Sequence, residues 1–257
     1  MRKQGNSAKA QQSGFTLVEM AIVMMIIGLL LGGLMPTLTT QMEVQRINET
    51  RKQMEEIQQA LLGFAIANGR LPCPADPAIA TGQANAGMEA TTGSGSAMTC
   101  TNVGNNAARG VLPWATLGVY ETDAWGNRYT YRVSRDFADA LGSATYGGCT
   151  PSPTPTLATF ALCSSGNLDV LVASGGTSLV NNVPSVVISH GKNGAGAYTQ
   201  QGTQLPVSSD ADEQENSDGS ADNNYVSKAP TPSFDDHILW LSQNILLNRM
   251  VTAGKLP

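Results

Sequence analysis

The residue with the clearest chemical implication is Glu19, which lies near the start of an apolar segment running from Phe15 to Met35. A helix needs about 20 apolar residues to cross a bilayer, so this segment is long enough to span one. A carboxylate inside hydrocarbon is costly, and acids in such segments usually have a partner and a function. In an isolated subunit we expect the charge of Glu19 to lack a partner. The sequence therefore predicts that a cation meets it in an assembled state.

The residues before this segment set its orientation. Arg2, Lys3 and Lys9 precede it without any acid, and this positive charge predicts a cytoplasmic N-terminus and an extracytoplasmic chain after the segment. A secretory signal peptide would place a small-residue cleavage site after the apolar run. Here no such site follows, and the obvious break in the pattern is Gly14, which comes before it.

The start of the chain resembles the type IV pilin and type II secretion pseudopilin superfamily, on the residues Gly14, Phe15, Thr16, Leu17 and Glu19. The resemblance implies cleavage after Gly14 by a prepilin peptidase and N-methylation of Phe15. It also implies that Glu19 meets the free amine of Phe15, its own or a neighbour's, when subunits stack. Further implied partners are other pilins or pseudopilins and an inner-membrane assembly platform. The alternative is an uncleaved membrane anchor with Glu19 in the interface.

A dense run of acids near the C-terminus raises the question of a metal. The run comprises Asp210, Asp212, Glu213, Glu215 and Asp218. Calcium takes several oxygen ligands, including carboxylates, and major pseudopilins have a calcium site in a comparable place, so the resemblance implies calcium here. The spacing departs from theirs and from an EF-hand loop. A solvated acidic loop is the alternative.

Four cysteines lie on the side expected to be extracytoplasmic: Cys73, Cys100, Cys149 and Cys163. In an oxidising compartment an even number predicts two disulfides, with three possible connectivities. We favour the sequential pairing, in which each bond closes one irregular loop. A metal site is disfavoured because no C-x-x-C pair is present and His190 and His237 are distant in sequence.

Sequence motifs for catalysis are missing. The chain has no G-x-S-x-G elbow, no H-E-x-x-H and no P-loop, and the glycines of 191–196 have the wrong spacing for a dinucleotide site. His190 follows Ser189 directly, and neighbours in a strand point to opposite faces. We therefore predict a protein that is not an enzyme.

Length and charge indicate one exported acidic domain. Of the 257 residues, the leader and a long helix leave enough for a single core. The net charge is −5, and loss of the three cationic side chains of the leader makes it −8. Binding nucleic acid through phosphates takes basic patches, so no nucleic acid is expected as a partner.

The element that positions the N-terminal residues is predicted to be one helix over 15–68, about 80 Å long, with a transmembrane part at 15–35. Its second half is amphipathic, with an apolar stripe of Val44, Ile47, Met54, Ile57, Leu61 and Phe64. Asn68 and Gly69 end it. Pro36 predicts a kink or local opening, and in the resembling filaments the stretch equivalent to that between Gly28 and Pro36 can melt on assembly. The alternative is that Gly and Pro are simply common in membrane helices.

The remaining chain, 69–257, is predicted to form a pilin-like globular domain with an α+β fold, in which a small antiparallel sheet packs on the helix. Residues 123–129 are similar to the D-P-W-G-N-x-Y motif of major pseudopilins, with Ala124 replacing proline, and they precede a strand in which Tyr129, Tyr131 and Val133 share a face. Further strands are expected at 158–162, 168–173 and 183–189.

One further segment is expected to be irregular, and another, at the C-terminus, is lacking in a minimal pseudopilin. Residues 78–108 are rich in small and polar types and predict a long loop or a poorly ordered insertion. Residues 235–250 predict an extra C-terminal helix, docked on its own domain or available to a partner.

These patterns favour a structural filament subunit, a minor pilin or pseudopilin, held in the inner membrane with a periplasmic domain and then drawn into a filament. The alternative function is a tip or substrate-binding module that uses 78–108 or the C-terminal helix.

Overall fold

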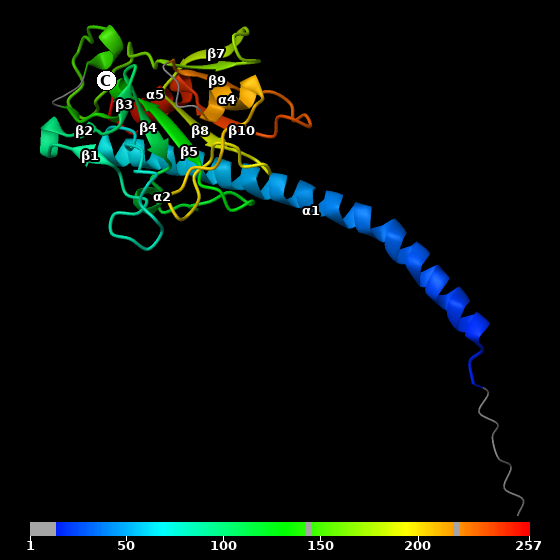
Figure 1. Cartoon of the computed structure of the whole chain (residues 1–257). Helices are drawn as coiled ribbons and strands as arrows, with labels where there is room; N and C mark the ends of the chain where they lie inside the picture. Colours follow the sequence, from blue (N-terminus) through cyan, green and yellow to red (C-terminus); the bar gives the residue numbers. More distant parts are fainter. Residues whose placement is uncertain (1–13, 142–144, 218–221) are drawn as a thin grey trace, which may run out of the picture. The chain divides into compact units, whose positions relative to one another are not determined.

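The computed structural model describes residues 14–141, 145–217 and 222–257, with backbone alone for residues 31–38. The described chain divides into two compact units, one ending at Gln45 and the other beginning at Arg46. The order of elements follows the expected α+β pattern: a long first helix, antiparallel sheets and a C-terminal helix (Figure 1).

The first helix, α1, runs over Leu17–Asn68, as predicted to within two residues. The helix continues through Gly28 and Pro36, and the melting expected on assembly stays a prediction. No helix among the described residues is long and apolar enough to cross a membrane. The expected span at 15–35 includes residues 31–35, whose side chains lie outside the described ones.

The C-terminal end of α1 is fixed by a glycine. The Gly69 amide donates to the Ala65 carbonyl at 2.8 Å, and Gly69 has φ of +72°, the left-handed conformation that favours glycine after a helix. A Cβ at this position would lie 2.1 Å from the Leu157 carbonyl oxygen. Position 69 therefore needs glycine both for its backbone conformation and for the close approach of a neighbouring chain segment.

The main sheet has five strands in the order β10-β8-β5-β4-β3, and all its pairs are antiparallel. Their bounds are β3 Val103–Gly104, β4 Ala107–Val111, β5 Thr130–Ser134, β8 Ser185–Ser189 and β10 His237–Leu241. Every residue of β5 and β8 is buried, so this sheet is covered on both faces.

One face of the sheet packs on α1. The largest cluster of buried side chains joins Ile57 and Leu61 of α1 to Tyr129 and Tyr131, and it includes Met250 near the C-terminus. Fully burying a large apolar side chain stabilises a fold by roughly 1.5–3 kcal/mol. The predicted stripe is correct at Met54, Ile57 and Leu61, whereas Val44 is exposed and Ile47 and Phe64 are only partly buried.

The other face of the sheet packs on a smaller sheet that the sequence did not predict as a separate layer. It has the order β7-β6-β9, with β6 Leu168–Leu171, β7 Ser178–Val183 and β9 Asn224–Val226. β6 pairs antiparallel with β7 and parallel with β9. Val186 and Ile188 of β8 contact Leu168 and Val170 in a second buried cluster.

The prediction of a strand at 158–162 is wrong. This segment is irregular, and it enters the core through Phe160, whose ring centroid lies 4.8 Å from that of Phe137. The Thr159 amide donates to the Gly69 carbonyl at 2.9 Å instead of to a neighbouring strand. The expected strands at 168–173 and 183–189 are present as β6 and β8.

The C-terminal helix is confirmed, but it is shorter than expected. Within 235–250, residues His237–Leu241 form β10, and the helix α5 covers Gln243–Thr252. Ile238 pairs with Ile188 and Trp240 with Val186 in the ladder to β8. An apolar run of five residues fits a strand as well as a helix, and here the open edge of the main sheet decides in favour of the strand.

The insertion at 78–108 is mostly irregular but crosslinked. It contains β1 Thr91–Thr92, the short 3-10 helix η1 Gly95–Ala97 and β2 Thr99–Cys100, and it reaches into β3 and β4. The structure has both disulfides in the sequential pairing, Cys73 with Cys100 and Cys149 with Cys163. The remaining short elements are α2 Trp114–Leu117, α3 Arg135–Ala138, η3 Tyr146–Gly148 and α4 Ala211–Ser217.

Candidate functional site

The predicted processing site lies in extended chain immediately before α1. Phe15 is 84% exposed, and nothing comes within 4 Å of a Cβ built at Gly14. Among the described residues, Gly14 and Phe15 on either side of the predicted cleavage point are therefore exposed.

Glu19 has a partner within its own chain, which sequence reasoning missed. Its Oε2 accepts bonds from the Thr16 amide at 2.8 Å and from Thr16 Oγ1 at 2.9 Å. The Glu19 amide donates back to Thr16 Oγ1 at 3.2 Å. This reciprocal arrangement is a capping box, in which a Thr and a Glu three residues later satisfy the free amides at a helix start. The T-x-x-E spacing of residues 16–19 could have revealed it.

The four acids of the predicted calcium set that the structure describes do not converge on one point. Asp212 forms an ion pair with Lys228, and this hydrogen bond is the main reason that its pKa lies below the usual value. Glu215 Oε2 accepts a bond from Ser174 Oγ at 2.7 Å. Asp210 is partly exposed, and its Oδ1 accepts the Asp212 amide at 2.9 Å. Asp218 lies outside the described residues.

Among the described acids of this set, Glu213 belongs to a different cluster, which we call the carboxylate cluster: Glu213 of α4 with Asp235 and Asp236, just before β10. One carboxylate oxygen from each residue lies within 4.8 Å of the other two. Glu213 is 1% exposed and Asp236 is 3% exposed. The cluster joins two segments more than twenty residues apart in sequence, so spacing alone could not reveal it.

Each carboxylate in the cluster uses one oxygen for hydrogen bonds. Glu213 Oε1 accepts from Asn193 Nδ2 at 2.8 Å, and Asp236 Oδ2 accepts from Asn216 Nδ2 at 2.7 Å. Asp235 Oδ2 accepts from the Asn193 amide at 3.0 Å. The second oxygens, Glu213 Oε2, Asp235 Oδ1 and Asp236 Oδ1, are buried and have no hydrogen-bond partner among the described residues.

The electrostatics of the cluster follow from burial. Burial, together with the nearby negative charges of Glu213 and Asp235, raises the pKa of Asp236 to about 8 against the opposing hydrogen bond from Asn216. Burial likewise raises the pKa of Asp235. His190 Nδ1 lies 3.8 Å from Asp236 Oδ1, and burial lowers the pKa of this imidazole to about 3, so it is neutral near pH 7.

Ser189 and His190 have separate partners. Ser189 Oγ donates to Asp123 Oδ2 at 2.6 Å, and His190 Nε2 lies 2.9 Å from Thr130 Oγ1. Asp123 also accepts the Trp125 and Asn127 amides at 3.0 Å each, which fixes the turn of the 123–129 motif. These buried polar groups therefore hold the turn and the sheet together.

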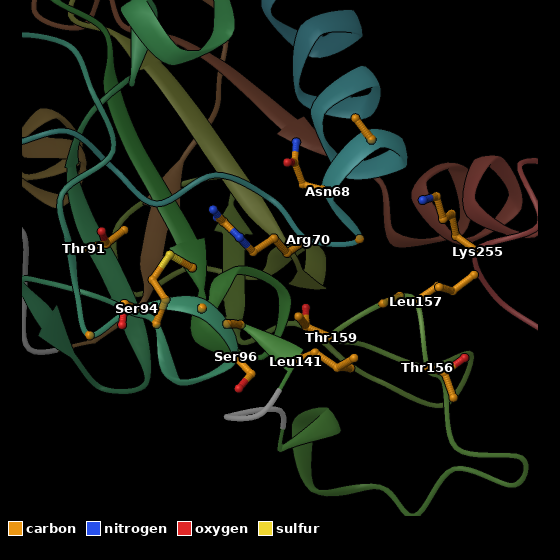
Figure 2. A pocket seen from close by; sticks show the side chains of 17 residues that line it. Asn68, Arg70, Thr91, Ser94, Ser96, Leu141, Thr156, Leu157, Thr159 and Lys255 are labelled. Atoms are coloured by element: carbon orange, nitrogen blue, oxygen red, sulfur yellow. The ribbon is translucent and has the colours of Figure 1, made fainter.

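A cavity of about 630 Å³ opens at the C-terminal end of α1, and we call it the helix-end cavity. Figure 2 shows its labelled side chains, with Arg70 drawn between Thr91 and Lys255. Arg70 is held by Glu89, with Nη1 to Oε1 at 2.6 Å and Nη2 to Oε2 at 3.0 Å. Residues of the predicted 78–108 loop therefore form part of a concave surface together with Lys255.

Comparison with protein families gives one match, to the prokaryotic N-terminal methylation motif, over residues 9–35. Comparisons with curated proteins and with solved structures gave no match. The chain thus carries a prepilin signal of the kind found in type IV pilins and pseudopilins. This signal points to a structural subunit and a prepilin peptidase substrate rather than to an enzyme.

Proposed function

We propose that the protein is a filament subunit, a minor pilin or pseudopilin, of a type IV pilus or a type II secretion filament. The observation that carries this proposal is the methylation motif at residues 9–35, whose central residues form the exposed start of α1. The precursor is cleaved after Gly14 and methylated on the amine of Phe15. It sits in the inner membrane as a single-pass protein with a periplasmic domain, and an assembly platform then moves it into the filament beside other pilins.

The capping box refines the role of Glu19 in assembly. All of the bonds from Thr16 reach Oε2, so Oε1 remains for a cation. Cleavage leaves the Thr16 amide intact, because the new amine belongs to Phe15. The carboxylate can therefore keep its own capping box while it receives the Phe15 amine of a neighbouring subunit.

Processing is tested by mass spectrometry of protein extracted from membranes of cells with an active prepilin peptidase. We expect a chain that begins at methylated Phe15. A chain that retains residues 1–14 in those cells contradicts the proposal and favours an uncleaved anchor.

Assembly is tested with three variants that separate charge from capping. Glu19→Gln keeps the capping geometry and removes the charge, Thr16→Val removes the capping hydroxyl and keeps the charge, and Glu19→Leu removes both. We expect the ratio of filament to membrane protein to fall in both Glu19 variants and to stay close to wild type in Thr16→Val. A wild-type ratio in Glu19→Gln would mean that the charge has no part in recruitment.

The helix-end cavity favours a second function, that of a binding module at the filament tip. It is lined by the 78–108 loop and by Lys255, which follows α5. Counting this subunit in purified filaments separates the two functions, because a tip module occurs about once per filament and a repeating subunit occurs along its length.

The carboxylate cluster supports a proposal of bound calcium, held by Glu213, Asp235 and Asp236 in place of the five acids named from the sequence. Calcium lies about 2.3–2.6 Å from its oxygen ligands, so two ligands on one ion are at most about 5 Å apart. The separations within 4.8 Å meet this limit, and each residue offers an oxygen without another partner. The ion would neutralise buried charge and fasten α4 to the segment before β10.

Calcium binding is tested on the full chain in detergent micelles by calorimetry and by thermal unfolding. We expect calcium to raise the unfolding temperature of wild type, and magnesium at the same concentration to raise it less. Glu213→Gln should lose the calcium response. Glu215→Gln, on the same helix but outside the cluster, should keep it. An equal calcium response in Glu213→Gln, or none in wild type, overturns the site.

A further inference from the structure

We propose that the helix-end cavity binds a saccharide that carries a carboxylate. The cavity volume of about 630 Å³ lies within the range of roughly 300–1,000 Å³ that is typical of small-molecule sites. This inference rests on the second proposed function, the binding module, and names the class of ligand that its cavity would take.

The walls of the cavity are held in place by crosslinks. The Cys73–Cys100 disulfide fastens the 91–98 segment next to the end of α1, and the Arg70–Glu89 ion pair repeats this connection. The Ala140 amide donates to the Met98 carbonyl at 2.8 Å, which joins a second wall to the first. A cavity bounded by loops but braced in this way needs little ordering when a ligand binds, and this favours affinity.

The lining is suited to a ligand with many hydroxyl groups. The lining residues with a side-chain hydroxyl or amide are Asn68, Thr91, Ser94, Ser96 and Thr156. Each hydroxyl both donates and accepts a hydrogen bond, as sugar hydroxyls do. The lining residues that the structure describes include neither a carboxylate nor an aromatic ring, so they disfavour cations and offer no surface for stacking a flat aromatic ligand.

The charge of the cavity indicates that one cation, Lys255, is available to meet a carboxylate of the ligand. Arg70 is neutralised by its bidentate pair with Glu89. Lys255 forms no ion pair with any residue that the structure describes, and it lies on the cavity wall. A single ammonium group matches one carboxylate, whereas a phosphate usually attracts an arginine fork or several amides.

The polar lining favours a saccharide over a peptide with a free C-terminus. A peptide site of this kind needs an apolar subsite for the last side chain, and here the apolar lining residues are interspersed among hydroxyl groups. Tighter binding of a peptide than of the saccharide would therefore overturn the proposal.

The experiment measures binding to the full chain in detergent micelles by calorimetry. The probes are trigalacturonate, neutral maltotriose, a trialanine peptide and inorganic phosphate. We expect trigalacturonate to bind at least tenfold more tightly than the other three, and added salt to weaken it, because the ammonium–carboxylate contact is partly exposed.

Variants identify the cavity as the site. Lys255→Met keeps the apolar stem, removes the charge and should weaken trigalacturonate binding about tenfold or more, as expected for a charge-assisted hydrogen bond. Lys255→Arg should retain most of it. Lys52→Met, the same change on the exposed face of α1, should have no effect. Tighter binding of trialanine, equal binding of both sugars, or an unchanged affinity in Lys255→Met overturns the proposal, whatever the filament assays give.

Discussion

The buried pair of Asp236 and His190 predicts a distinctive dependence of stability on pH. Burial raises the pKa of Asp236 from 3.8 to about 8 and lowers the pKa of His190 from 6.5 to about 3. The negative charges of Glu213, Asp235 and Asp210 also act on Asp236. The positive charge of Arg132 acts on the imidazole of His190. Both groups are therefore neutral in the fold over a range where the unfolded chain is charged.

The contributions of Asp236 and His190 to the free energy of unfolding change in opposite directions as the pH rises. The favourable contribution of Asp236 is complete below its unfolded pKa of 3.8 and is lost as the pH rises through about 8. The contribution of His190 is complete above its unfolded pKa of 6.5 and is lost as the pH falls through about 3. From pH 3.8 to 6.5 the two slopes offset each other. Above this range the slope from His190 no longer offsets that from Asp236, which by itself lowers the free energy of unfolding by about 1.4 kcal/mol per pH unit, or about 2 kcal/mol by pH 8.

The assay is urea unfolding of the full chain in micelles, followed by tryptophan fluorescence, at about pH 5, 6.5 and 8 with a chelator present to remove bound cations. Asp236→Asn should abolish the fall above about pH 6.5. His190→Gln should extend the fall down to about pH 4. Asp76→Asn, a carboxylate outside the cluster, serves as the control and should leave the fall in place. Equal stability of wild type at pH 6.5 and 8, or an unchanged fall in Asp236→Asn, refutes the reasoning.

Two further predictions concern the end of α1 and the crosslinks. Gly69→Ala should lower the free energy of unfolding by about 2 kcal/mol or more, because it combines a left-handed backbone with a Cβ 2.1 Å from a backbone oxygen. Gly254→Ala, at a position with φ of +68° and open space, should lower it less. Equal urea midpoints for the two variants would contradict this prediction. The disulfide between Cys149 and exposed Cys163 should be reduced by dithiothreitol before the buried one, and alkylation with mass spectrometry gives the order.

The long helix could be predicted from sequence because its determinants are local. The apolar period of Met54, Ile57 and Leu61 and the stop at Gly69 depend on neighbours within a turn or two of the chain. The predicted burial was correct at the C-terminal end of the stripe, because this end packs on the sheet. Val44 belongs to the other compact unit, and its exposure there could not be read from the same period.

The sheets could be predicted only in part, because strand pairing is decided by distant segments. β5 and β8 were found from their β-branched and aromatic content, but β7 contains Asn182 with φ of +59° and reads as a turn. β10 reads as a helix in isolation, and its pairing with β8 joins residues about fifty positions apart. Local propensity cannot supply that information.

The same division between local and distant determinants applies to the candidate sites. The capping box is local, and the T-x-x-E spacing was visible in the sequence. The carboxylate cluster could be predicted only in part, because Glu213 lay in the expected acidic run whereas Asp235 and Asp236 lay at the start of the expected C-terminal helix, 235–250. A high density of acidic residues in the sequence is as typical of a solvated surface as of a metal site. Burial of the carboxylates, which the sequence does not report, distinguishes the two.

The capping box changes what assembly has to contribute at Glu19. If this carboxylate had no partner in the isolated subunit, relief of an unmet charge would by itself favour recruitment. Because Thr16 already supplies two donors to Oε2, assembly adds only the neighbour's amine at the remaining oxygen. Adhesion must then come mainly from the exposed apolar side chains of α1, such as Met24 and Leu29. The charge pair would select the register at which two helices meet, since a shift along α1 leaves the amine without its carboxylate. Under this reasoning Glu19→Gln lowers the accuracy and yield of assembly without abolishing contact between subunits.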